Sequence, residues 1–187
     1  MNKISLESTL HETFDMPCLA YNIMLYICIL GDGTLRLWDS TTPPHSTAFT
    51  HCQAGELLAC DWSKYDPNHL FTAGVDTNVR LWDIRQLSAP VLVMGGHTQA
   101  VRRLKCDPFR GNIVATCSYD FTVRIWDIGK VQSSTPPLLE TVSHHSEFTF
   151  GLDLCSLTPG KVSSMMSNLV EVMPVTAEAH PRVIIML

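Results

Sequence analysis

Residues 115–127 read ATCSYDFTVRIWD, and this stretch decides the fold because the chain repeats it. Related stretches are TAGVDTNVRLWD at residues 72–83 and the shorter GDGTLRLWD at residues 31–39. The Trp-Asp pairs that end them begin at positions 38, 82 and 126, so they recur every 44 residues, and the turn aspartates keep the same interval. Three copies at one identical spacing indicate an internal structural repeat.

Each copy has the pattern of a β-hairpin. Val123 and Ile125 alternate with other residue types in the strand that we expect at residues 122–127. A turn at residues 118–121 precedes it, and residues 113–117 are expected to form the strand before that turn. A period of about 40–45 residues that ends in Trp-Asp is typical of a WD-repeat propeller blade. The sequence therefore predicts an all-β fold, a WD40 β-propeller.

The repeated polar residues have a structural interpretation. A buried indole N–H needs a hydrogen-bond partner, and WD blades supply it with a hydrogen-bonded group of Trp, Ser/Thr, His and Asp. The third copy offers Trp126, Thr116, His97 and Asp120, the second Trp82, Thr72 and Asp76, and the first Asp32 and Trp38. The histidine of the second copy stays open, because His51 lies 11 residues before Trp62 whereas His97 lies 9 before the equivalent Cys106. We expect these groups to hold the blades together rather than to carry out chemistry.

Further strands complete the repeat region, residues 31–161. We expect them at residues 57–62, 70–74, 79–84 and 91–94 in the second blade and at residues 101–106 and 138–142 in the third. Residues 144–154 have the pattern of the opening of a fourth blade, with His144 or His145 as its histidine, but no Trp-Asp pair follows. The sequence thus predicts an incomplete propeller of three to three and a half four-stranded blades.

The two ends, residues 1–30 and 162–187, do not fit the repeat. Residues 18–30 are apolar, but this run is too short for a bilayer, which takes about 20 residues, and begins too late for a signal peptide. We expect no membrane insertion and an improvised strand in the last part of the run. Pro174 and Pro181 interrupt the tail, which we expect to be unassigned and poorly ordered.

The length is small for a closed ring. A propeller closes with typically about 4–8 blades, whereas 187 residues hold little more than four periods of 44. An open arc leaves apolar faces and strand edges in water. We therefore expect a fragment, an isoform or a flawed gene model of a longer propeller protein, and the alternative is closure by assembly with other chains.

Composition excludes several classes of function. The net charge is −5 and there is no long Lys/Arg run, which argues against a nucleic-acid surface. Seven cysteines without a CxxC pair indicate a reducing compartment, and they do not combine with histidines at zinc-like spacing. No GxSxG, HExxH or P-loop motif occurs. The sequence predicts neither an enzyme nor a bound cofactor or metal.

Three segments go beyond a generic repeat: LLACDWSKYDPNHLFTAGVDTNVRLWDIR (57–85), GGHTQAVRRLKCDPFRGNIVATCSYDFTVRIWD (95–127) and LLETVSHHSEFTFGLDL (138–154). Together they resemble the later blades of the peroxin-7 family, the receptors for the type 2 peroxisomal targeting signal. The family's earlier blades and its closing blade have no counterpart here.

The resemblance implies a cytoplasmic receptor that shuttles to peroxisomes and binds newly made matrix proteins. It implies a cargo signal of the form Arg/Lys-Leu-(five residues)-Gln/His-Leu, bound as an amphipathic helix, and action with an import co-receptor and docking proteins. The alternative is a generic WD-repeat scaffold in another complex, such as a ubiquitin-ligase adaptor.

WD blades usually expose three positions to partners: the residue before the turn Asp and those three and five after the blade His. In this chain the candidates are Val75, Glu56 and Leu58 in the second blade, Tyr119, Ala100 and Arg102 in the third, and Phe148 and Phe150 in the fourth, with Glu147 beside them. An apolar patch with acidic neighbours suits a helix that carries leucines and an Arg or Lys. The alternative is that Phe148 and Phe150 merely pack between blades.

Overall fold

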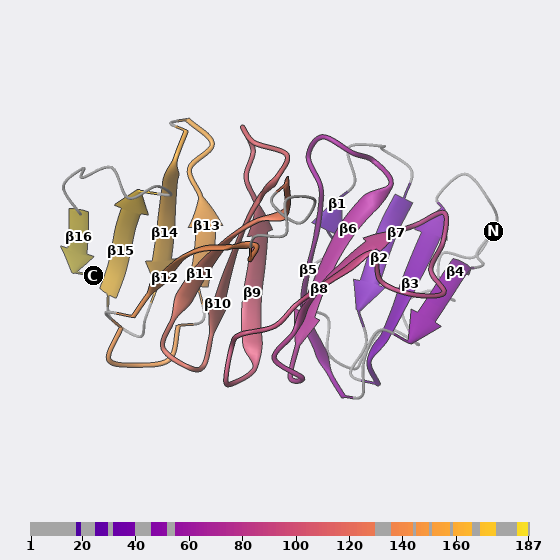
Figure 1. Cartoon of the computed structure of the whole chain (residues 1–187), viewed down its shortest axis with the longest axis horizontal. Coiled ribbons are helices and arrows are strands. Elements are labelled where there is room, and N and C mark those ends of the chain that lie inside the picture. Colours follow the sequence, from indigo (N-terminus) through magenta and orange to yellow (C-terminus); the bar gives the residue numbers. More distant parts are fainter. Residues whose placement is uncertain are drawn as a thin grey trace, which may run out of the picture.

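In the computed structural model, the described part of the chain forms sixteen strands in four antiparallel sheets of four. Within every sheet the strands are neighbours in chain order, so each sheet is a simple meander. Figure 1 shows the sheets following one another across the molecule, from β1–β4 in indigo to β16 in yellow. The structure describes residues 18–19, 25–29, 32–39, 46–51, 55–129, 136–143, 145–149, 151–157, 159–165, 169–174 and 183–186.

The sheets have the following strands. The first contains β1 (Cys18–Leu19), β2 (Leu25–Ile29), β3 (Thr34–Asp39) and β4 (Ser46–His51). The second contains β5 (Leu57–Trp62), β6 (His69–Gly74), β7 (Val79–Asp83) and β8 (Leu92–Met94). The third contains β9 (Val101–Cys106), β10 (Ile113–Ser118), β11 (Val123–Asp127) and β12 (Leu138–Val142). The fourth contains β13 (Gly151–Leu154), β14 (Lys161–Met165), β15 (Leu169–Pro174) and β16 (Val183–Met186).

The strands predicted for the second and third blades are confirmed, each within one residue at either end. The improvised strand expected before the first Trp-Asp pair is also present as β2, which pairs with β3. Four sheets are present where the sequence predicts three to three and a half blades. The larger number arises at the C-terminal end of the chain.

Residues 162–187, which the sequence leaves unassigned, contain most of β14 and all of β15 and β16 in the structure. The prediction is wrong for these residues. β14 pairs with β13, β15 pairs with β14, and β16 pairs with β15. The physical reason is that a meander needs backbone partners and an apolar strand pattern, which residues 169–173 (LVEVM) supply, but not a Trp-Asp signature. The signature marks a well-defined blade, and its absence does not prevent a sheet.

The two faces of β11 pack against different neighbours. Val123 and Ile125 share a buried cluster with Leu152 of the fourth sheet. Trp126 lies in a cluster with Phe71 of the second sheet. The alternation read from the sequence therefore gives the strand one apolar face for each neighbouring sheet, as period-two side-chain direction requires.

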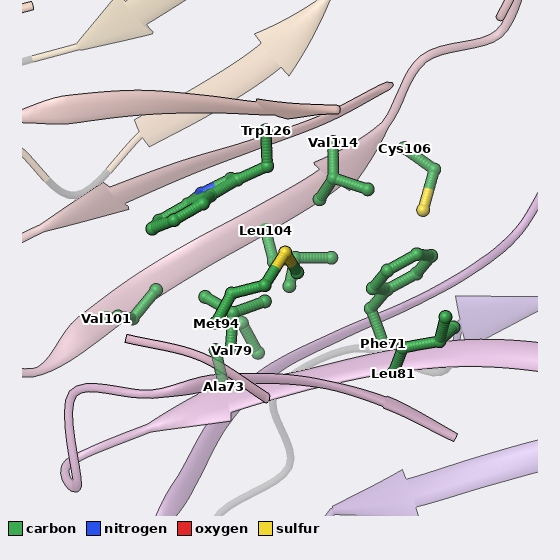
Figure 2. Close-up of a cluster of buried hydrophobic side chains, with 11 residues drawn as sticks. Phe71, Ala73, Val79, Leu81, Met94, Val101, Leu104, Cys106, Val114 and Trp126 are labelled. Carbon is green, nitrogen blue, oxygen red and sulfur yellow. The ribbon is translucent and has the colours of Figure 1, made fainter. Parts of the chain in front are cut away.

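The core between the second and third sheets is shown in Figure 2. Trp126 and Val114 approach it from the third sheet, and Phe71 and Leu81 from the second, with Met94 between them. Trp126, Phe71 and Val114 are at most 1% exposed. Burial of aromatic and branched side chains at this contact supplies the main apolar stabilisation of the pair, since each such side chain contributes about 1.5–3 kcal/mol.

The first strands of successive sheets lie beside one another, because β5 contacts β9 and β9 contacts β13. A buried hydrogen bond also crosses between sheets: the Cys106 backbone N–H donates to Asp61 Oδ2 over 2.8 Å. Asp61 is 4% exposed. Adjacent first strands form the inner edge of a propeller, so this arrangement matches an open arc of propeller blades.

None of the described segments forms a helix with the length and apolarity that a membrane crossing requires.

Candidate functional site

The third sheet brings its four predicted polar residues into one chain of hydrogen bonds. Trp126 Nε1–H donates to Thr116 Oγ1 over 2.9 Å, and His97 Nε2 lies 2.8 Å from the same oxygen. His97 Nδ1 lies 2.9 Å from Asp120 Oδ2. Because a carboxylate can only accept, Nδ1–H of the neutral imidazole donates to Asp120, and the Thr116 hydroxyl donates to Nε2 while its oxygen accepts from Trp126. The group links strands β10 and β11 to the segment before β9, which is a structural role.

Asp120 also organises the turn between β10 and β11. Its carboxylate accepts hydrogen bonds from the Thr122 N–H, the Thr122 hydroxyl and the Thr98 N–H. Burial alone would raise the pKa of Asp120, but these bonds and the bond from His97 together outweigh burial and lower it below the ordinary 3.8. Burial is the largest influence on His97 and lowers its pKa below the ordinary 6.5, although the bond to Asp120 opposes this.

These shifts predict a stability that falls in acid. When the folded pKa of a group lies below its unfolded value, the unfolded chain takes up the proton first as the pH drops. The His97 contribution is therefore lost as the pH falls from 6.5 through the lower folded pKa, and the Asp120 contribution as it falls below 3.8.

Urea titrations at pH 7.5, 6, 5 and 4 measure this pH dependence. We expect the free energy of unfolding to decrease at each step, and the decrease between pH 7.5 and 5 to be smaller in His97→Gln. A wild-type chain that is equally stable at pH 7.5 and 5, or a variant with an unchanged slope, would contradict the assignment.

The second sheet builds its group differently. Trp82 Nε1–H donates to Thr72 Oγ1 over 2.9 Å, as in the third sheet. Asp76 forms an ion pair with Arg80, whereas Asp120 bonds His97. His51 lies in β4, the outer strand of the first sheet, so its backbone belongs to a different blade and the displaced spacing noted in the sequence has a structural counterpart.

The first and fourth sheets have partial groups. In the first, Asp32 Oδ1 accepts from the Thr34 N–H and hydroxyl, the same turn geometry as Asp120 with Thr122. Trp38 pairs with Tyr26 through the backbone of β3, and its side chain lies outside the described residues. In the fourth, His145 Nε2 lies 3.0 Å from Ser164 Oγ, within hydrogen-bond distance.

The histidine of the fourth blade is therefore His145, since the Ser164 bond repeats the contact between His97 and Thr116. His144 lies outside the described residues. Met173 faces Val162 in the register that Trp126 and Val114 have in the third sheet. The tail thus has no tryptophan at this position, which explains why the sequence pattern missed the blade.

The turns before the third strands share an unusual backbone. Thr77 and Phe121 have φ values of 69° and 63°, and Gly33 at the same place in the first sheet has 78°. This left-handed conformation costs a non-glycine residue about 1 kcal/mol or more. A phenylalanine held there, and 40% exposed, is a feature that packing alone does not require.

Three aromatic side chains meet where the turn between β10 and β11 lies beside the segment that precedes β13. We call these residues, Tyr119, Phe121 and Phe148, the rim patch. The Tyr119 and Phe148 rings are 5.2 Å apart at 73°, and the Phe121 and Phe148 rings are 5.3 Å apart. Phe148 is 55% exposed. The Phe148 ring thus packs against Tyr119 and Phe121 and also remains exposed to solvent.

The sequence does not predict Phe121 as a contact residue, because within the turn the offset rule includes only the residue before Asp120, and Phe121 follows it. The repeat itself carried a signal: Gly33, Thr77 and Phe121 occupy one position of the 44-residue period, and the glycine marks it as a left-handed site. A large apolar residue at a site that favours glycine can be recognised without a structure.

In the second and third sheets, the same backbone hydrogen bond joins two of the candidate contact residues. The Val75 N–H donates to the Glu56 carbonyl over 3.1 Å, and the Tyr119 N–H donates to the Ala100 carbonyl over 3.0 Å. Val75 and Glu56 are both exposed. Gly55 keeps this edge compact, because its φ is 110° and a Cβ there would lie 2.7 Å from Val75.

The remaining candidates differ in exposure. Leu58, Ala100 and Arg102 are half-buried, Glu147 is exposed, and Phe150 lies outside the described residues. The edge that the structure shows therefore carries the rim patch in the third and fourth sheets and Val75 with Glu56 in the second. Within the described part of the chain, no three His, Cys, Asp or Glu side chains gather as metal ligands.

Comparisons with known proteins agree with this architecture. The family described as WD domain, G-beta repeat matches residues 44–83 and 88–127. The peroxisomal targeting signal 2 receptor of Mus musculus is 51% identical over 79 residues, which cover 42% of this chain and 24% of that protein. The receptor of the same name from Saccharomyces cerevisiae is 33% identical over 161 residues, covering 69% of this chain and 43% of that protein. Human coronin-7 is 40% identical over 73 residues, 8% of its length.

The four meander sheets, the Trp-Thr hydrogen bonds and the matched repeats at residues 44–83 and 88–127 define the fold as an incomplete β-propeller with WD repeats. The chain is similar to the peroxisomal targeting signal 2 receptors of mouse, human, Dictyostelium discoideum and yeast. The chain spans about a quarter or less of the length of the mouse and human receptors.

Proposed function

We propose that this chain supplies part of the cargo-binding surface of a receptor for type 2 peroxisomal targeting signals. The observation that carries the proposal is the rim patch, where Tyr119 and Phe148 from two different sheets are in ring contact and Phe148 is 55% exposed. Soluble proteins rarely leave clustered aromatic side chains exposed without a partner. Similarity to relatives named as receptors for this signal supports the choice of ligand.

The chemistry of the edge fits such a signal. An amphipathic helix is bound when its apolar side chains reach an apolar surface, and the leucines of the expected signal would contact the rim patch. Glu56 and Glu147 are exposed beside this edge, where a carboxylate would attract the Arg or Lys of the signal. The receptor would be cytoplasmic, would shuttle to peroxisomes, and would act with a co-receptor and docking proteins.

Fluorescence anisotropy with a labelled peptide of the form Arg-Leu-(five residues)-His-Leu tests the proposal on the full chain. We expect Phe148→Ala to weaken binding at least tenfold, since aromatic anchors dominate such interfaces, and Glu56→Gln to weaken it several-fold. Phe109→Ala is the matched control, because Phe109 is exposed at the opposite end of β10. Its expected effect is less than twofold.

Equal binding of a peptide in which the two leucines are replaced by serine would refute the assignment. So would a Phe148→Ala variant with wild-type affinity. A chain that binds neither peptide would favour a general WD-repeat scaffold.

A further inference from the structure

A cavity of about 600 Å³ opens between the third and fourth sheets. Arg102, Arg103 and Lys105 of β9 line it together with Tyr119, and Asp153 of β13 lies on its other side. This volume is within the range of about 300–1,000 Å³ that is usual for ligand sites. We propose that this cavity binds a carboxylate of an acidic peptide segment from a partner protein.

The charge of the lining favours an anion. Three cationic side chains face one carboxylate, so the formal balance is +2. Arg103 and Lys105 form no ion pair with any carboxylate in the part of the chain that the structure describes. Both are half-buried, and a partly desolvated cation interacts more strongly with an incoming carboxylate than one in open water.

The blade does not require cations at these positions. Arg103 pairs with Cys117, and the same register in the second and fourth sheets contains Ala59 and Gly151. Both replacements are small, so the blade folds without a long side chain here. The arginine therefore needs an explanation other than folding.

Because of Lys105, the junction between the third and fourth sheets differs from the junction between the second and third sheets. Lys105 pairs with Ala115, the register that Asp61 occupies in the second sheet. Asp61 accepts the Cys106 N–H and so joins the second sheet to the third. A lysine cannot accept this bond. The third sheet thus has no equivalent acceptor toward the fourth, and the cavity lies at that junction.

The rim patch next to the cavity indicates which residue type should flank the acidic residue of the partner. Tyr119 lines the cavity and also belongs to the rim patch, where its ring contacts Phe148. An apolar residue next to the acidic one would therefore reach the aromatic rings. Because the type 2 signal carries an Arg or Lys, this ligand has the opposite charge, and the inference does not depend on the proposed cargo.

The test uses the full chain and three labelled eight-residue peptides that differ only at their core: Glu-Phe-Glu, Gln-Phe-Gln and phosphoserine-Phe-phosphoserine. We expect the Glu peptide to bind at least tenfold more tightly than the Gln peptide, with affinity that falls as salt is raised. Arg103→Gln combined with Lys105→Gln is expected to remove this preference. Lys161→Gln is the control, because Lys161 is exposed at the start of β14 whereas Met165, at its end, lines the cavity. This variant should leave the preference for the Glu peptide unchanged.

Equal affinity for the Glu and Gln peptides overturns the proposal, and so does an unchanged preference in the Arg103, Lys105 variant. Binding of the phosphorylated peptide alone would also overturn it, since the ligand would then be a phosphate. Circular dichroism of the variants verifies that they fold. The same double variant is expected to bind the type 2 signal peptide as the wild type does, so the two proposals can fail separately.

Discussion

Trp126→Ala is expected to lower the free energy of unfolding by about 3–5 kcal/mol, the usual cost of deleting a buried aromatic side chain. Trp126 is 1% exposed and fills the contact between the second and third sheets beside Phe71 and Leu104. Its loss leaves a cavity and also removes the N–H that donates to Thr116. Urea unfolding followed by far-UV circular dichroism measures the change.

Trp126→Phe serves as the second variant in case the alanine variant does not fold. Phenylalanine refills most of the space but has no N–H, so we expect a loss between that of alanine and zero. A change of less than 1 kcal/mol for the alanine variant would contradict the view that this ring couples the two sheets. The roughly 5–15 kcal/mol stability of ordinary domains makes the expected loss large.

Thr116→Val is expected to be the second most damaging change, although valine has nearly the same shape as threonine. The hydroxyl of Thr116 is the meeting point of Trp126 and His97, and the residue is fully buried. Valine would leave two buried polar groups without a partner, at about 1–3 kcal/mol each. The free energy of unfolding at pH 7.5, measured in urea, gives the loss.

Thr116→Ser is the matched control, because serine keeps the hydroxyl and deletes only a methyl group. We expect it to cost less than the valine variant. A double-mutant cycle with Trp126→Phe separates the bond from its surroundings. If the valine and serine variants were equally stable, the hydrogen-bonded group would not be what holds this blade together.

The repeated stretch predicted the middle of the molecule well. Period-two alternation and the 44-residue spacing placed the strands of the second and third sheets within one residue, and they predicted the bonds of Trp126, Thr116, His97 and Asp120. These features are local: a side chain's direction along a strand and its distance from a turn follow from the backbone itself.

The candidate site was predicted only in part. Tyr119 and Phe148 were named from their offsets within the repeat, and the structure brings their rings together. Phe121 completes the rim patch, yet no offset rule includes it. The basic cavity was also out of reach, because Arg102 was considered alone and the side chains that share the cavity come from two sheets.

By itself, the sequence determined the all-β class, the length of the repeat and the hydrogen-bonded group of the third blade, since strand periodicity, turn residues and polar partners are encoded within about forty consecutive positions. Only the tertiary structure decided that the tail completes a fourth sheet and that β9 and β13 enclose a cavity. Pairing of β15 and β16 depends on backbone groups that every residue carries, and a cavity depends on how two sheets fail to fill the space between them.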